Sequence, residues 1–367
     1  MGLRYDLTVP FSKCIALNKN DITFPFKRYE IAKVFRDGPI KAGRDREFTQ
    51  CDIDVVGIDG QLIEAELISL YVEGFSRLDI EVVIKYNSRN LMIGLIKECD
   101  IEENLINQTV TIIDKIEKLS REDFNKALSE IGVTSEKTQK LLDLFSKDLE
   151  TLIKEYSKSN NEDLVKGIKE LSQLNKYLKQ LNLMKYCEFS SSLARGQDYY
   201  TGNVFEVYEK NGKLSCSIGG GGRYDKIITN FIDDGNSYPA VGVSFGLTAL
   251  YEILKDKPYF ENESLIDVYI IPINTEIESL KLANSIRKLG LKVDLEMSDR
   301  KLRKSLNYAN KQNIKYVIVL GEDEIKNGKF ILKDMNANNE YDIDINNIDF
   351  ICSIIEKNKF AKNNKPC

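Results

Sequence analysis

One stretch of eight residues combines several side chains that could bind or activate a small molecule. Residues 195–202 read Arg-Gly-Gln-Asp-Tyr-Tyr-Thr-Gly, so a fixed cation, a carboxylate and two phenols stand between glycines. The next run, Asn203 to Tyr208, has the β-branched and aromatic content and the alternating polarity of a strand. We therefore expect the polar cluster near the edge of a sheet, where side chains converge on a small molecule. Structural ion pairs and buried tyrosines produce similar stretches, so other segments must decide.

Two strand-like runs upstream add a second set of polar side chains. Alternate residues of a strand share a face. In the first run one face carries Arg28, Glu30, Ala32, Val34 and Arg36, and in the second it carries Arg46, Phe48, Gln50, Asp52 and Asp54. The connection over residues 37–45 is turn-rich and basic, so the pair predicts an antiparallel hairpin. Arg36 and Arg46 at its root suit a nucleotide phosphate, because guanidinium groups pair bidentately with phosphate oxygens. A solvated sheet face is the alternative.

Two further segments give weaker signals. Leu3 to Phe11 alternates in polarity and reads as a strand with Arg4, Asp6 and Thr8 on one face. An Asp and a Thr at this spacing would hold an ammonium group, and they are equally ordinary surface residues. The run Gly219–Gly222, followed by Arg-Tyr-Asp, allows a ligand to approach the backbone closely. It does not match a strand-to-helix phosphate loop.

The composition excludes several mechanisms. The chain has no histidine, so no imidazole of its own acts as a base, relays a proton or binds zinc. Its seven cysteines, at positions 14, 51, 99, 187, 216, 352 and 367, form no Cys-x-x-Cys pair. We expect reduced thiols in a cytoplasmic protein and assign no metal site. The net charge of −5 argues against indiscriminate nucleic-acid binding and leaves room for a basic patch that holds one RNA.

The order of predicted elements divides the 367 residues into four segments. Residues 1–99 mix strands with a helix over 61–77, and residues 100–182 are rich in Lys, Glu, Leu and Ile with helical spacing, which predicts a helical insertion. Residues 183–258 return to strands and glycines. From 264 to 360 strands alternate with helices, which predicts a small α/β domain with a largely parallel sheet. No apolar run is long enough to span a bilayer, and no signal peptide is visible.

Taken together, these segments resemble histidyl-tRNA synthetase, a class II aminoacyl-tRNA synthetase. Residues 3–11, 26–36 and 43–54 look like the region of its motif 2, residues 195–202 resemble its histidine signature, and residues 220–225 resemble the companion of that signature. Residues 265–357 look like the class II anticodon-binding domain. The resemblance implies an α+β fold: a class II antiparallel sheet with flanking helices, the helical insertion and a C-terminal anticodon-binding domain.

The resemblance also implies a role for individual residues. Asp6 and Thr8 would hold the amino group of histidine, and Gln50, Asp54, Tyr199 and Tyr200 would line its pocket. Arg36 and Arg195 would act on the α-phosphate, so we expect them to meet over one pocket. The remaining ATP-binding positions would be Arg46, Gly220, Gly222 and Arg223. The implied reaction is activation of histidine with ATP, followed by transfer to tRNA(His). Adenylation needs positioning and cationic stabilisation rather than a protein nucleophile, and Mg²⁺ would share that load.

Three departures from the family leave the activity of this chain open. The sequence begins at Met1, after the point at which the family's motif 1 builds a homodimer interface, so we expect uncovered apolar surface. Motif 3 normally presents an arginine to ATP, whereas Thr248 and Ala249 stand at the usual Glu-Arg positions. Asp45 and Gln197 replace the usual Tyr and Leu.

A basic run in the last segment is a candidate contact for tRNA. Arg300, Lys301, Arg303 and Lys304 begin a predicted helix in an otherwise acidic protein, which suits RNA phosphates or anticodon bases. A solvated helix face is the alternative. For the whole chain, the alternative to a histidine–tRNA ligase is an impaired fragment or paralogue that binds histidine or tRNA in a regulatory role.

Overall fold

The structure is a computed structural model, and it describes residues 2–195, 199–214, 216–255, 264–298 and 300–355. The chain forms two compact units that divide between Lys255 and Asp256. The elements of the first unit are α1 (Thr8–Leu17), β1 (Phe26–Phe35), β2 (Glu47–Val56), α2 (Leu62–Arg77), β3 (Val82–Ser88), α3 (Arg89–Glu98), η1 (Glu103–Leu105), α4 (Ile106–Ile113), η2 (Ile116–Lys118), α5 (Arg121–Glu130), α6 (Ser135–Phe145), α7 (Leu149–Tyr156), α8 (Glu162–Gln180), η3 (Met184–Tyr186), β4 (Cys187–Phe189), β5 (Asn203–Glu209), β6 (Gly219–Arg223), α9 (Asp225–Ile232), β7 (Ala240–Gly246) and α10 (Leu247–Leu254).

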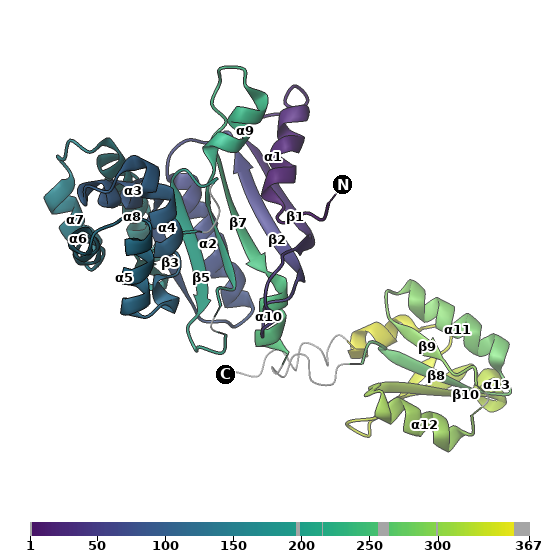
Figure 1. The fold of residues 1–367 in the computed structure, drawn as a ribbon. Coiled ribbons are helices and arrows are strands. Elements are labelled where there is room, and N and C mark those ends of the chain that lie inside the picture. Colours follow the sequence, from purple (N-terminus) through teal and green to yellow (C-terminus); the bar gives the residue numbers. More distant parts are fainter. Residues whose placement is uncertain (1, 196–198, 215, 256–263, 299, 356–367) are drawn as a thin grey trace. The chain divides into compact units, whose positions relative to one another are not determined.

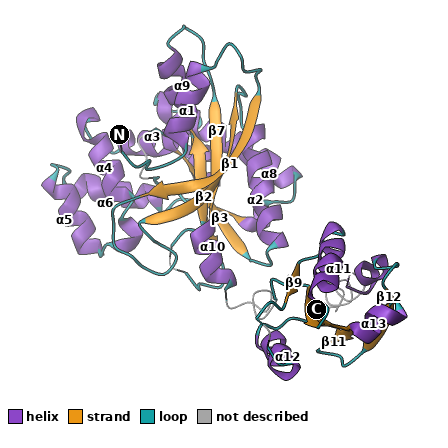
Figure 2. Cartoon of the chain, turned by 90° about the vertical axis from the view of Figure 1, so that its right-hand side faces the viewer, coloured by secondary structure: helices purple, strands orange, loops and turns teal. Residues whose placement is uncertain are grey.

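A seven-stranded sheet forms the centre of the first unit, in the order β1-β2-β7-β6-β5-β3-β4 (Figure 1). Every neighbouring pair is antiparallel except β3 and β4. Helices surround the strands (Figure 2). Helix α2 packs on one face, where the rings of Tyr71 and Phe75 lie 4.8 and 5.1 Å from the ring of Phe245 on β7. The predicted α+β fold is confirmed.

The predicted hairpin is formed by β1 and β2. Its antiparallel register pairs Arg28 with Asp54 and Ala32 with Gln50, so the expected polar face exists. Strand β2 pairs in turn with β7, which sets Asp52 opposite Ser244. The carboxylates of β2 and the amide of Gln50 therefore lie beside β7, the next strand of the sheet.

The prediction of a strand over residues 3–11 is wrong. Helix α1 begins at Thr8, because three apolar residues, Leu7, Phe11 and Ile15, recur at a spacing of one helical turn and are all buried. The Asp6 carboxylate accepts a hydrogen bond from the backbone N–H of Val9 at 3.1 Å and satisfies one of the unpaired donors at the helix start. Asp6 and Thr8 are thus held by a helix N-terminus, not by a strand face.

The glycine run forms the central strand β6. A Cβ atom on Gly221 would lie 2.1 Å from the carbonyl oxygen of Gly242 on β7, and one on Gly222 would lie 2.8 Å from the ring of Tyr200. Contacts this short leave no room for any other residue. The glycines therefore let β6 lie close to the backbone of β7 and beneath the ring of Tyr200.

The helical insertion packs onto the sheet through a close crossing of α3 and α8. A Cβ atom on Gly94 would lie 2.5 Å from the Cα of Leu164, and one on Gly167 would lie 2.2 Å from the backbone nitrogen of Leu91. The two backbones are therefore nearly in contact. Within the insertion, the Ser120 side chain accepts a hydrogen bond from the N–H of Asp123 and caps α5. The proposed boundaries of the four segments stay a prediction.

The second unit is a five-stranded sheet with helices, in the order β12-β11-β10-β8-β9. Its elements are β8 (Val268–Ile273), α11 (Glu276–Lys288), β9 (Val293–Leu295), α12 (Leu302–Lys311), β10 (Tyr316–Gly321), α13 (Glu322–Asn327), β11 (Lys329–Asp334) and β12 (Glu340–Asp344), with residues 349–355 helical. Strand β8 is parallel to β9 and β10, whereas β10–β11 and β11–β12 are antiparallel. The expectation of a largely parallel sheet is therefore only half right, because the chain returns after β11 by a hairpin that the sequence analysis missed. No helix in the described ranges is both long and apolar enough to cross a membrane.

Gly167→Ala tests the crossing of α3 and α8. Alanine favours an isolated helix by about 1 kcal/mol, but overpacking against backbone atoms costs about 1–3 kcal/mol. We expect a net loss in the free energy of unfolding, measured by urea titration. Lys176→Ala, at an exposed position of the same helix, should change it by less than about 0.5 kcal/mol. A Gly167→Ala variant as stable as the natural chain would contradict the close crossing.

Candidate active site

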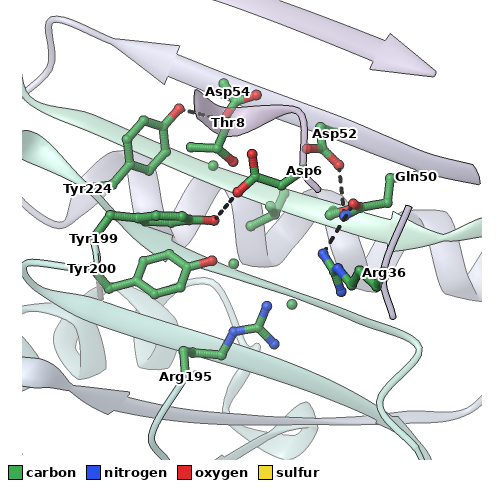
Figure 3. A pocket seen from close by; sticks show the side chains of 15 residues that line it. Asp6, Thr8, Arg36, Gln50, Asp52, Asp54, Arg195, Tyr199, Tyr200 and Tyr224 are labelled. Carbon is green, nitrogen blue, oxygen red and sulfur yellow. Dashed lines mark hydrogen bonds between the residues drawn. The ribbon is translucent and has the colours of Figure 1, made fainter. Parts of the chain in front are cut away.

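A pocket on the seven-stranded sheet collects side chains from distant parts of the sequence (Figure 3). It is lined by Asp6, Thr8, Arg36, Gln50, Asp52, Asp54, Arg195, Tyr199, Tyr200, Gly220, Gly221, Tyr224, Gly242, Val243 and Ser244. Arg36 and Arg195 line this same pocket, as the sequence analysis required. Most of the expected site residues are therefore brought together.

Arg36 is held between two aromatic rings. Its guanidinium carbon lies 4.7 Å from the ring centroid of Tyr5 and 4.9 Å from that of Phe48, distances at which a cation is attracted to a ring face. One nitrogen donates to the Gln50 side chain at 3.4 Å. No ion pair in the described part of the chain involves Arg36, so its charge is available to an anionic ligand.

Arg195 is held by a carboxylate on β5. Its Nη1 lies 3.0 Å from Oε1 of Glu206. Glu206 is fixed in turn by Ser217, which donates to the same oxygen at 3.2 Å, and by Tyr208, which donates to the other at 2.5 Å. A Cβ atom on Gly220 would lie 2.5 Å from Nη1 of Arg195. The bare backbone of β6 therefore makes the space that this guanidinium occupies.

Two tyrosines line the pocket close to the start of α1. The ring centroids of Tyr199 and Tyr200 lie 4.8 Å apart, and the Tyr199 hydroxyl donates to Oδ2 of Asp6 at 3.2 Å. Burial raises the pKa of Tyr199 far above its usual range, so this phenol stays protonated and acts as a donor. The tyrosine thus orients a carboxylate that faces the pocket.

Asp52 lines the pocket beside the amide of Gln50. That amide nitrogen donates to Asp52 at 3.4 Å and to the hydroxyl of Ser244 at 2.8 Å. Burial raises the pKa of Asp52 to about 7, the hydrogen bond with Ser244 opposes the shift, and the nearby charge of Asp54 adds to it. Asp52 therefore changes charge close to neutral pH.

Asp54 is almost fully buried, with an ion-pair partner at one oxygen and a hydrogen-bond donor at the other. Arg28 approaches its Oδ2 at 2.8 Å, and the Tyr224 hydroxyl donates to Oδ1 at 2.5 Å. Burial raises the pKa of Asp54 to about 6, while Arg28 and the Tyr224 hydrogen bond oppose the shift. A Cβ atom on Gly242 would lie 2.0 Å from Oδ1, so only glycine on β7 permits this placement.

Three residues expected at an ATP site do not line the pocket. The Arg46 side chain is 66% exposed, lies 3.8 Å from Asp37 and donates to the carbonyl of Gly38. Gly222 packs beneath the ring of Tyr200.

Arg223 is buried behind the pocket. Its Nε lies 2.7 Å from Oε1 of Glu64, and the other oxygen of Glu64 accepts from Asn203 at 2.7 Å. Because its guanidinium is committed to a fully buried carboxylate, the expectation that Arg223 binds ATP is not carried forward.

The sequence analysis missed several lining residues: Asp52, Gly221, Tyr224, Gly242, Val243 and Ser244. Asp52 shares the strand face of Gln50 and Asp54, so the alternation held a signal for it. Ser244 enters the site because β7 pairs with β2, and a single sequence gives no signal for that long-range pairing.

Two expected features need separate mention. Residues 196–198, including Gln197, lie outside the described residues.

In the second unit, Lys301, Arg303 and Lys304 are exposed at the start of α12. Arg300 lies 3.5 Å from the buried carboxylate of Glu296, with its guanidinium carbon 4.6 Å from the ring centroid of Tyr308. The described residues contain no group of three or more side chains suited to hold a metal ion.

An antiparallel sheet that holds arginines and carboxylates over one pocket, joined in sequence to a separate mixed α/β unit, is the architecture of a class II aminoacyl-tRNA synthetase. The Histidyl-tRNA synthetase family matches residues 1–250, and the Anticodon binding domain family matches residues 267–351. The chain belongs to the histidyl-tRNA synthetase family.

Individual relatives agree with this placement. The chain is 43% identical over 350 residues to Histidine–tRNA ligase 1 of Bacillus cereus (strain ATCC 10987 / NRS 248), covering 95% of this chain and 80% of the relative. It is 36% identical over 346 residues to the Histidine–tRNA ligase of Bacteroides fragilis, covering 92% and 75%. The crystal structure of histidyl-tRNA synthetase from Nostoc sp. PCC 7120 superposes with a TM-score of 0.82 at 30% identity, covering 97% of this chain and 83% of that one. The family function is histidine–tRNA ligation, and the regulatory alternative is not favoured.

Arg223→Met tests the structural role of the buried pair. Removing one partner leaves the Glu64 carboxylate uncompensated, which costs about 3–5 kcal/mol. We expect a loss of that size in the free energy of unfolding. Lys27→Met, which breaks a pair with Glu66 whose side chains are both about half exposed, should cost less than about 1 kcal/mol. An Arg223→Met variant of normal stability but weakened ATP binding would restore the expectation of an ATP role.

Proposed function

We propose that this pocket binds histidine and ATP, forms histidyl-adenylate and then transfers the histidyl group to tRNA(His). The observation that carries the proposal is that Arg36 and Arg195, far apart in sequence, line one pocket together with the carboxylate of Asp6. Cations for a phosphate and an acceptor for an ammonium group thus stand in the same small space.

The carboxylate side of the pocket suits histidine. Asp6 and Thr8 would take the α-ammonium group, because an ionised carboxylate and a hydroxyl at a helix start both accept hydrogen bonds. Gln50 and Asp54 supply further acceptors, and the rings of Tyr199 and Tyr200 offer flat apolar faces to an imidazole. Asp52 extends the same acidic surface.

The arginine side suits ATP. In the reaction, a carboxylate oxygen of histidine attacks the α-phosphorus, an O–P bond forms, and the bond to pyrophosphate breaks. Arg36 and Arg195 would stabilise the charge on the phosphate oxygens, and Gly220 leaves the space in which the Arg195 guanidinium lies. A ribose hydroxyl of tRNA(His) then attacks the acyl carbon and AMP leaves. No step requires a histidine side chain of the enzyme.

Mg²⁺ fits this site as a companion of ATP. The described residues offer no preformed cluster of ligands, but Mg²⁺ in nucleotide sites takes most of its ligands from phosphates and water, with one or two carboxylates. The ion would supply additional neutralisation of the phosphate charge.

The position of the family's motif 3 arginine holds the buried Ala249 on α10. We infer that the chain activates histidine without that charge, through Arg36, Arg195 and the ion that accompanies ATP. In the second unit, Lys301, Arg303 and Lys304 would contact tRNA phosphates, because their side chains stand together and exposed at one helix end.

The edge strand β1 supports a homodimer. Tyr29 and Ile31, on its face opposite the carboxylates, are 75% and 58% exposed, and Leu17 of α1 is 75% exposed. An uncovered apolar edge favours association with a second copy.

Arg195→Ala and Arg36→Ala test the assignment of the pocket. Each removes a cation aimed at the phosphate, and the loss of one such donor costs about a hundredfold to a thousandfold in rate. We expect both variants to lose histidine-dependent ATP–pyrophosphate exchange by factors of that order. Arg77→Ala, at an exposed position of α2, is the matched control and should exchange at the natural rate.

Two results would count against the proposal. Exchange that survives both pocket substitutions would place the reaction elsewhere. Tight histidine binding by the natural chain without any exchange would instead favour a binding protein derived from a synthetase.

The homodimer has its own test. Tyr29→Lys together with Ile31→Lys places like charges on the apolar edge, and we expect the molar mass from sedimentation equilibrium to fall from two chains to one. A variant with the sedimentation behaviour of the natural chain would move the interface away from β1. A natural chain that is monomeric at tens of micromolar would remove the dimer altogether.

A further inference from the structure

A buried arginine lies just behind the pocket and touches both halves of the proposed histidine site. Arg28 is on β1, its side chain is 11% exposed, and it is not part of the pocket lining. We propose that Arg28 is a positioning residue for histidine binding, whose guanidinium holds the Asp54 carboxylate in place and joins it to the loop that carries Asp6 and Thr8. This inference rests on the proposed function of the pocket.

The first half of the argument concerns Asp54. Its two oxygens have separate partners, since Nη2 of Arg28 lies 2.8 Å from Oδ2 and the Tyr224 hydroxyl donates to Oδ1 at 2.5 Å. The missing side chain of Gly242 provides the space for Oδ1. A carboxylate fixed in this manner accepts a hydrogen bond from a ligand without paying for reorganisation at the moment of binding.

The second half concerns the start of α1. The same Nη2 donates to the carbonyl oxygen of Leu7 at 3.3 Å, and Leu7 stands between the pocket residues Asp6 and Thr8. The guanidinium carbon lies 4.0 Å from the ring centroid of Phe11, one turn further along α1. A single planar cation therefore links the start of α1 to β2, through the two contacts of Nη2 and the stacking of the flat guanidinium on Phe11.

The charge of Arg28 also bears on the ionisation of Asp54. Burial raises the pKa of Asp54 to about 6, and Arg28 is the strongest opposing influence. The other charged or titratable groups around Asp54 are Glu30 on β1, Asp52 on β2, Asp6 before α1, and the phenols of Tyr224 and Tyr199. Of these, the Glu30 carboxylate favours the protonated form of Asp54, and the charge of Asp54 raises the pKa of Asp52 in turn. Without Arg28, Asp54 would hold its proton to higher pH.

The sign of the pH effect follows from this arrangement. If ionised Asp54 receives a hydrogen bond from histidine, affinity rises with pH through the pKa of Asp54 in the empty site and then levels off. Loss of the Arg28 charge moves that rise upward by about one pH unit or more. Removing both the contacts and the charge of Arg28 should therefore lower affinity at every pH, and the loss at pH 6 should exceed the loss near pH 9 by about fivefold or more.

The experiment measures histidine binding by isothermal titration calorimetry from pH 5.5 to 9 in the full chain. Arg28→Met removes the charge, Arg28→Lys keeps it, and Arg4→Met is the matched control. Arg28 and Arg4 both pair with Glu30, but in the described part of the chain Arg4 forms no ion pair or hydrogen bond with Asp54. We expect Arg28→Met to shift the pH dependence, and Arg28→Lys to lower affinity with a nearly unshifted dependence. Arg4→Met should bind histidine as the natural chain does. The imidazole of the ligand also titrates in this pH range, but its contribution to the binding curve is the same for every variant and cancels in the comparison.

A second measurement needs no histidine. Carboxyl ¹³C resonances in aspartate-labelled protein, assigned to Asp54 by their loss in Asp54→Asn, give the ionisation midpoint of Asp54 directly. An upward shift in Arg28→Met together with the shifted binding curve supports the inference. An unshifted midpoint, or affinity lowered equally at every pH, overturns it, because Arg28 then acts only on general stability. If Arg28→Met does not fold, an Arg28→Lys variant with natural affinity at every pH overturns it as well. If Arg28→Met shifts the midpoint but Asp54→Asn binds histidine normally, Arg28 still controls the pKa of Asp54. Asp54 then has no part in the histidine site, and the positioning role of Arg28 in histidine binding is overturned.

Discussion

The pocket depends on keeping opposite charges close together without letting them pair. Two arginines and three aspartates line one small space, yet none of these arginines forms an ion pair with any of these aspartates. Four of these five groups have a holder of their own instead. Arg36 lies between two rings, Arg195 is tied to Glu206, Asp54 to Arg28 and Tyr224, and Asp6 to Tyr199. If the cations paired with the aspartates, neither phosphate nor ammonium would find an open partner. The structure thus separates charges in order to leave them available.

Backbone without side chains makes this separation possible. Gly220 leaves room for the guanidinium of Arg195, and Gly242 leaves room for the carboxylate of Asp54. These glycines stand on adjacent antiparallel strands, where pairing fixes the position of every atom more tightly than in a loop. The entropic cost of glycine in a strand is offset in part by packing behind the sheet, where the Tyr71 hydroxyl lies 3.0 Å from the carbonyl oxygen of Gly220 and 2.8 Å from that of Ser244 and shares its one hydrogen between them. Chemistry on one face therefore relies on aromatic packing on the other.

The sequence predicted best where local periodicity decides the structure. The β1–β2 hairpin and its polar face followed from strand alternation. The meeting of Arg36 with Arg195 followed from the family resemblance. The start of α1 was misread because a few alternating residues look alike in a strand and at a capped helix start, and only the burial of Leu7, Phe11 and Ile15 decides. Ser244 was missed because its place depends on pairing between strands far apart in sequence. Arg223 was expected at the nucleotide and pairs with Glu64 instead, because a guanidinium suits a phosphate and a buried glutamate equally well. Pattern indicates the kind of group present, whereas tertiary contacts decide which groups remain free.

The absence of histidine from the chain gives the acidic surface of the pocket a particular importance. Enzymes commonly place an imidazole where a group must change charge near neutral pH. Here burial raises the pKa of Asp52 to about 7 and that of Asp54 to about 6, so carboxyl groups titrate in the range that imidazole normally covers. The imidazole in this pocket would be that of the substrate itself. If histidine binds here as proposed, the positions of these acceptors would decide how its imidazole is held, and the buried partners behind the pocket fix those positions.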